Sequence, residues 1–98
     1  MVKRVRFLAH GGMVQGWLIY HVAGLLYFTR GRAAEHKLTG WVRNTDNNQV
    51  EGEAQGAEDA LSKFLKEVDK GPRGSQVVKL DKEDRDVVEG EEGFEIRR

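Results

Sequence analysis

Apolar and charged residues alternate at the start of the chain, which is typical of a half-buried strand. The alternation continues to Phe7 within residues Val2–Ala9, and a period of two places every second side chain on the same face. His10, Gly11 and Gly12 follow, and the two glycines permit the positive φ angles of a tight loop. The pattern therefore predicts a first strand that ends before this loop.

A helical period is clearest over Ala57–Lys70. Its apolar residues recur three and four positions apart and form one stripe, made by Leu61, Phe64, Leu65 and Val68. Gly71 and Pro72 follow directly and stop a helix. We therefore expect an amphipathic helix that covers a sheet.

The other segments complete an α+β pattern. It predicts a helix over Tyr27–Lys37, strands over Leu38–Arg43 and Gln49–Gln55 joined by a hairpin at 44–48, and strands over Gln76–Leu80 and Gly93–Arg97. Residues Asp81–Glu92 are acidic and mostly polar, so we expect a mobile connection with solvated carboxylates such as Glu91 and Glu92. The order βαββαβ, with a short terminal strand, predicts a ferredoxin-like sandwich with two helices on one face of an antiparallel sheet.

Composition limits the classes of function. A chain of 98 residues suits a single domain, 1–98, and the absence of cysteine excludes disulfides and thiolate zinc sites. Residues 1–49 carry seven Lys and Arg against two Asp and Glu, and residues 50–98 carry nine against fourteen. The basic first half suits a small anionic ligand, whereas basic clusters interleaved with aromatics, as nucleic-acid binding requires, are absent from the sequence.

The N-terminus reads as a strand rather than a signal peptide, so we expect a cytoplasmic protein.

The segment Trp17–Phe28 is uncharged apart from His21. It is shorter than the roughly twenty residues that a membrane-spanning helix needs. It fits an N-terminal extension of the first helix, and Trp17–Val22 also fits a strand. Because a small domain cannot bury both faces of such a segment, self-association through Trp17–Phe28 is an expected property.

Two motifs stand at related positions. Gly12-Met13-Val14-Gln15-Gly16 lies between the first strand and the first helix, and Gly40-Trp41-Val42-Arg43-Asn44 is followed by Val50 and Gly56. Together they resemble the two signatures of the acylphosphatases, enzymes that hydrolyse carboxyl-phosphate anhydrides. The resemblance covers nearly the whole chain except the segment after Gly16.

The resemblance implies a reaction and a separate role for each of the two motifs. An acyl phosphate and water would give a carboxylate and inorganic phosphate, without a metal or another cofactor. The backbone N–H groups of Gly12, Met13, Val14, Gln15 and Gly16 would hold the phosphoryl oxygens, and glycines suit such an anion cradle. Asn44 would be the catalytic residue that orients the attacking water, because an amide donates and accepts hydrogen bonds without titrating.

This chain departs from the family where an arginine binds the phosphate. Counting forward from Gly16 places that arginine at Tyr20, and counting back from Trp41 places it at Leu26, which indicates an apolar insertion near 17–22. Arg30, His10 or His21 could substitute for it. We expect impaired turnover. One alternative is an inactive domain of this fold that binds a partner or self-associates. Another is that the departure comes from an altered coding sequence or an engineered loop.

Overall fold

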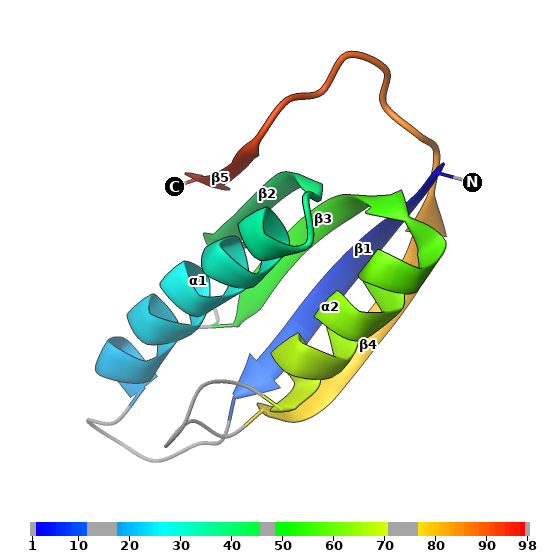
Figure 1. The fold of residues 1–98 in the computed structure, drawn as a ribbon. Coiled ribbons are helices and arrows are strands. Elements are labelled where there is room, and N and C mark those ends of the chain that lie inside the picture. Colours follow the sequence, from blue (N-terminus) through cyan, green and yellow to red (C-terminus); the bar gives the residue numbers. More distant parts are fainter. Residues whose placement is uncertain (1, 12–17, 46–48, 71–76, 98) are drawn as a thin grey trace.

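The computed structural model describes residues 2–11, 18–45, 49–70 and 77–97, and gives the backbone alone for 11, 18–25 and 77–79. These residues form two helices and a five-stranded sheet, with both helices on one face (Figure 1). In chain order the elements are β1 (Val2–Gly11), α1 (Leu18–Glu35), β2 (Thr39–Asn44), β3 (Val50–Ala57), α2 (Glu58–Lys70), β4 (Val77–Arg85) and β5 (Phe94–Arg97). The strand order β4-β1-β3-β2-β5 confirms the ferredoxin-like sandwich. Strand β5 pairs in parallel with β2, so the sheet is mixed.

The core lies between the helices and this face of the sheet. Val5, Phe7 and Ala9 of β1 are buried, as the alternation predicts. The apolar stripe of α2 is also buried, and the ring of Phe64 meets that of Phe7 edge-on, with 5.6 Å between ring centres. Burial of these side chains is the main force that docks α2 on the sheet.

Helix α1 begins at Leu18, so the prediction that the first helix extends towards its N-terminus is confirmed. The alternative of a strand over Trp17–Val22 is wrong for residues 18–22, and Trp17 lies outside the described residues. A helix satisfies its own backbone hydrogen bonds, whereas a strand here would need a neighbour. The helix ends in a turn in which Lys37 adopts a φ of 58° and the Leu38 N–H donates to the Ala33 carbonyl over 2.8 Å.

The predicted bounds of β4 are too short. We expected a strand over Gln76–Leu80 and a mobile segment after it, but β4 continues to Arg85 and pairs antiparallel with β1. An edge strand can carry charged side chains, because its outward-facing positions remain in water. The unbroken run of charged residues over Asp81–Arg85 therefore resembles a polar loop although it forms a strand.

The expectation of solvated acidic residues is also wrong for Glu91. Strands β4 and β5 lie at opposite edges of the sheet, so the connection Asp86–Gly93 passes the end at which β1 begins (Figure 1). The Gln55 side chain holds this connection like a paired strand, since it accepts from the Val88 N–H and donates to the Val88 carbonyl, both over 2.8 Å. Arg4 binds Glu91, so the connection is attached to the sheet at two points.

Candidate active site

Asn44 lies at one end of the sheet, where three segments meet. It is the last residue of β2 and pairs with Val50 at the start of β3, and Val50 pairs with Ala9 near the end of β1. Because side chains alternate along a strand, Asn44 shares the helix-covered face with Val42. Its side chain is exposed, whereas that of Val42 is buried. The amide is therefore at the rim of the core and accessible to a ligand.

The loop predicted to bind phosphate, Gly12–Gly16, lies outside the described residues, but the segments that flank it are described. Strand β1 ends at Gly11 and α1 starts at Leu18, and Figure 1 shows both at the end of the sheet that carries Asn44. The first-turn N–H groups of a helix lack intrahelical partners and carry partial positive charge. The first turn of α1 contains no acidic residue. The described ends of β1 and α1, which flank the first motif in sequence, thus lie at the same end of the sheet as Asn44.

His10 ties the last residues of β1 to two other strands. Its Nε2 is 2.8 Å from Asp81 Oδ2 on β4, and its Nδ1 is 2.8 Å from Gln49 Nε2, just before β3. This arrangement fits a ring whose Nε2–H donates to the carboxylate while Nδ1 accepts from the amide. The register of β1 against β4 shifts between His10 and Gly11, as in a β-bulge. Sequence reasoning identified His10 but could not identify these partners, which are distant in the chain.

These contacts bear on the prediction that His10 could substitute for the phosphate-binding arginine that the family resemblance implies. Both of its ring nitrogens are engaged by protein groups, so the ring lacks a free N–H for phosphate. The side chain of His21 lies outside the described side chains. The geometry therefore favours a role for His10 in holding the end of β1.

Arg30 is also poorly placed to replace that arginine. Its guanidinium carbon lies 5.1 Å from the centre of the Tyr27 ring, on the exposed side of α1, whereas Leu26 packs against the core. Arg30 follows Leu18 by twelve residues, which is about 18 Å along a helix at 1.5 Å per residue. By the same measure Leu26 is about 12 Å from the start of α1, whereas Tyr20 lies within its first turn. Of the two positions obtained by counting, Tyr20 is the nearer to the loop.

The cation next to Asn44 in sequence is paired on the other face of the sheet. Arg43 donates from Nε to Glu51 Oε1 over 2.9 Å, and Arg6 binds the second oxygen of the same carboxylate. Hydrogen bonds from Arg6 and then Arg43 outweigh the effect of burial and lower the pKa of Glu51. Both guanidinium groups are thereby paired on the face of the sheet opposite Asn44.

Across the described residues, no group of three or more His, Asp or Glu side chains forms a metal-binding cluster. In the part of the chain that the structure describes, neither helix is long and apolar enough to cross a membrane.

Comparison with known proteins places these features in a family. The family model of the acylphosphatases matches residues 5–96. An acylphosphatase of Bacillus licheniformis is 41% identical over 85 residues, which cover 87% of this chain and 88% of that protein. An acylphosphatase of Geobacillus kaustophilus is 39% identical over 95 residues, covering 97% and 94%. The crystal structure of an acylphosphatase from Bacillus subtilis superposes with a TM-score of 0.82 at 34% identity, over 100% of both chains. With this match along nearly its full length, the chain belongs to the acylphosphatase family.

Proposed function

We propose that this chain hydrolyses acyl phosphates to a carboxylate and inorganic phosphate, at a rate reduced by the loss of the phosphate-binding arginine. The observation that carries the proposal is the family match over residues 5–96. The position of Asn44 beside the ends of β1 and β2 supports a common site for the two motifs. The absence of a cofactor and the cytoplasmic location stay predictions.

The proposed mechanism is a single in-line displacement. Backbone N–H groups of Gly12–Gly16 hold the phosphoryl oxygens, and the Asn44 amide orients a water molecule towards phosphorus. The water oxygen forms a bond to phosphorus as the bond from phosphorus to the acyl oxygen breaks. The water proton passes to the product phosphate. The acyl group leaves as a carboxylate, which is stable without protonation at neutral pH, so the step needs no general acid.

The missing arginine limits this mechanism. A guanidinium binds phosphate oxygens through two parallel N–H groups and keeps its charge at any working pH. Removal of one donor to a transition state lowers the rate by about 10²–10³. The engaged ring of His10 and the outward position of Arg30 argue against rescue by either residue. We therefore expect weak turnover.

Hydrolysis of benzoyl phosphate tests the proposal. The natural chain is compared with Tyr20→Arg, with Leu26→Arg, and with a variant that lacks Trp17–Val22 and carries Leu26→Arg. We expect little turnover by the natural chain and recovery in Tyr20→Arg or the shortened variant. Full turnover by the natural chain would contradict the proposed impairment. Inactivity of all four, with circular dichroism showing intact folds, would contradict the proposed hydrolase function.

A second candidate is a binding domain that self-associates through Trp17–Phe28. The described part of this segment offers one supporting observation, because Tyr27 is 62% exposed on α1. Sedimentation equilibrium over a concentration series tests this candidate. Association that disappears on deletion of Trp17–Val22 supports it, and a monomer at all concentrations contradicts it.

A further inference from the structure

A groove separates α2 from the edge of the sheet formed by β1 and β4, away from the candidate active site. Its volume is about 280 Å³, slightly below the usual size of small-molecule sites. Its floor is apolar and consists of Val5, Leu61, Leu65 and Leu80. Its rim is polar and consists of Lys3, Glu58, Ser62, Lys66, Asp69 and Lys82.

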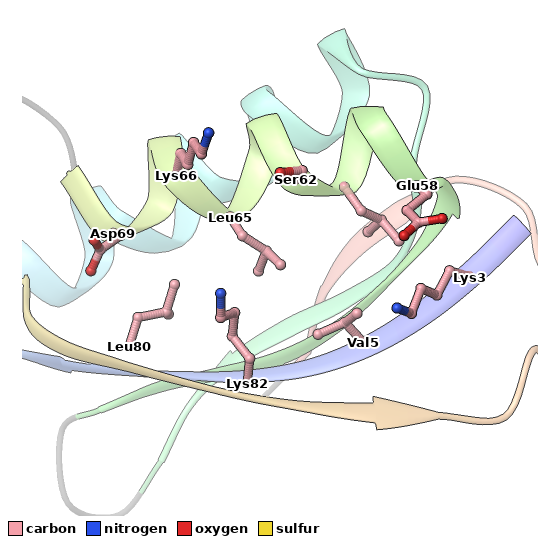
Figure 2. Close-up of a pocket in the computed structure, with 10 residues that line it drawn as sticks. Lys3, Val5, Glu58, Ser62, Leu65, Lys66, Asp69, Leu80 and Lys82 are labelled. Atoms are coloured by element: carbon pink, nitrogen blue, oxygen red, sulfur yellow. The ribbon is translucent and has the colours of Figure 1, made fainter.

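Two of the lysines stand on the helix-covered face of the sheet, where apolar residues are usual. Lys3 shares the face of Val5, and Lys82 pairs with the buried Phe7. Figure 2 shows the side chains of Lys3 and Lys82 extending from the strands into the space beneath α2. The groove thus combines ammonium groups with an aliphatic floor.

The charges of these lysines are weakly compensated by the protein. Lys3 Nζ lies 3.8 Å from Asp84 Oδ1, and this carboxylate is 78% exposed. Within the described residues, Lys82 has no carboxylate at ion-pair distance. Glu58 and Asp69 lie in the first and last turns of α2, eleven residues apart, or about 16 Å along the helix. The middle of the groove is therefore a suitable place for an anion.

We propose that this groove binds a small amphiphilic carboxylate. Its head group would pair with the ammonium group of Lys82, and a short aliphatic or aryl tail would extend over Leu65 and Leu61 towards the end of the groove that carries Lys3. Both parts are required, because exposed ion pairs alone are weak and a small apolar tail alone has little area to bury. A ligand of about eight non-hydrogen atoms at ordinary ligand efficiency implies a Kd on the order of 1 mM or weaker.

The groove and the candidate active site can be distinguished experimentally. Strands β1 and β3 separate β4 from β2, which corresponds to about 14 Å at the usual strand spacing. A ligand in the groove therefore leaves Asn44 uncovered. Binding is also measured without turnover, so the result does not depend on the proposed enzymatic function.

A titration followed by ¹⁵N–¹H correlation spectra tests the proposal, with hexanoate as the probe. Acetate carries the same charge without the tail, and 1-hexanol carries the same tail without the charge. We expect hexanoate to shift the amide signals of Lys3, Leu65 and Lys82 in a saturable manner, and both controls to bind more weakly. Lys82→Gln should weaken hexanoate binding about three- to five-fold, the upper range for an exposed ion pair. Lys3→Gln should weaken it less, because Lys3 lies four residues further along the sheet and is next to Asp84. Lys63→Gln on α2, outside the groove lining, is the matched control and should leave the affinity unchanged.

Three outcomes would overturn the proposal: equal binding of hexanoate and 1-hexanol, shifts centred on Asn44 instead of the groove, and no shift at 50 mM hexanoate, a concentration above even a Kd of about 17 mM, which eight atoms imply at about 0.3 kcal/mol each. If hexanoate causes no shift, the variant Lys82→Ile tests a different role for Lys82. Inward-facing lysines protect edge strands from pairing with other chains. Dimerisation of Lys82→Ile, without any binding of hexanoate by the natural chain, would assign Lys82 to that role.

Discussion

The guanidinium of Arg4 holds the carboxylate of Glu91 through two hydrogen bonds, from Nη1 to Oε1 over 2.7 Å and from Nη2 to Oε2 over 3.2 Å, between residues 87 positions apart. The Arg4 side chain is only 3% exposed and that of Glu91 15%. Arg4 also donates from Nε to Glu53 Oε1 over 2.6 Å. One buried cation therefore joins β1, β3 and the connection Asp86–Gly93, and this connection positions β5 against β2.

Glu91→Gln should destabilise the fold. The substitution removes the charge that faces the Arg4 guanidinium while keeping the size of the side chain, and a hydrogen bond to a charged group contributes about 1.5–3 kcal/mol. Urea denaturation should show a loss in the free energy of unfolding of about this size. Glu92→Gln is the matched control, because Glu92 is exposed and is the next residue in the chain. Equal effects of the two substitutions would show that the contact with Arg4 contributes little.

Stability should fall as the pH drops below about 4.5, the ordinary pKa of a glutamate. Burial alone would raise the pKa of Glu91, but the hydrogen bonds from Arg4 and Thr39 outweigh it, so the pKa is lowered. The pKa of Glu51 is lowered as well, chiefly by Arg6. Since both values lie below those of the unfolded chain, the unfolded state takes up protons first, and the stabilisation is lost as the pH falls through the folded-state values.

Urea denaturation between pH 7 and pH 3 measures this loss. Glu51→Gln and Glu91→Gln should each flatten the acid limb of the stability profile, because each removes one group with a lowered pKa. An acid limb identical to that of the natural chain in both variants would contradict the assignment.

Substitution by alanine should change the stability of the fold in opposite directions at two glycines. A Cβ at Gly40 would lie 1.9 Å from the Glu53 carbonyl oxygen, and the φ of Gly40 is 140°, which side chains rarely permit. A Cβ at Gly31, within α1, meets no atom within 4 Å. We expect Gly40→Ala to destabilise by at least about 2 kcal/mol and Gly31→Ala to stabilise by about 1 kcal/mol. Thermal unfolding of both variants checks the prediction, and a change of stability in the same direction for both would refute it.

Thr29→Val should stabilise the protein slightly. Thr29 is fully buried on α1, and its hydroxyl has no hydrogen-bond partner among the described residues. Valine has nearly the same shape and lacks the hydroxyl, whose burial without a partner costs about 1–3 kcal/mol. The melting temperature should rise for Thr29→Val and fall for Thr29→Ser, which keeps the hydroxyl and loses a methyl group. A fall in both would indicate that the hydroxyl is hydrogen-bonded in solution.

Asn44→Ala should lower kcat by about 10²–10³ when introduced into whichever variant recovers hydrolysis of benzoyl phosphate. The KM should change little, because the proposed role is to orient water rather than to bind phosphate. Arg43→Gln is the neighbouring control, since Arg43 pairs with Glu51 on the other face of the sheet. Similar losses of kcat in both variants would point to distortion of β2 rather than to a role of the Asn44 amide.

Local patterns were sufficient for much of the fold. The alternation in Val2–Ala9 and the apolar stripe of α2 are repeated side-chain periods, and each predicts its element and its buried face without knowledge of any partner. The motif Gly40–Asn44 identified the residue at the end of β2, because the motif and the strand are contiguous in sequence.

Only the tertiary structure decided features that depend on distant partners. The charges of Asp81–Arg85 read as a polar connection until their pairing with β1 is known, and Glu91 reads as solvated until Arg4 is placed beside it. The same holds for His10, whose partners Asp81 and Gln49 come from separate segments. The sequence determined which faces are apolar because hydrophobic burial follows a local period. It could not determine how the charges pair, because an ion pair depends on a distance that only the folded chain sets.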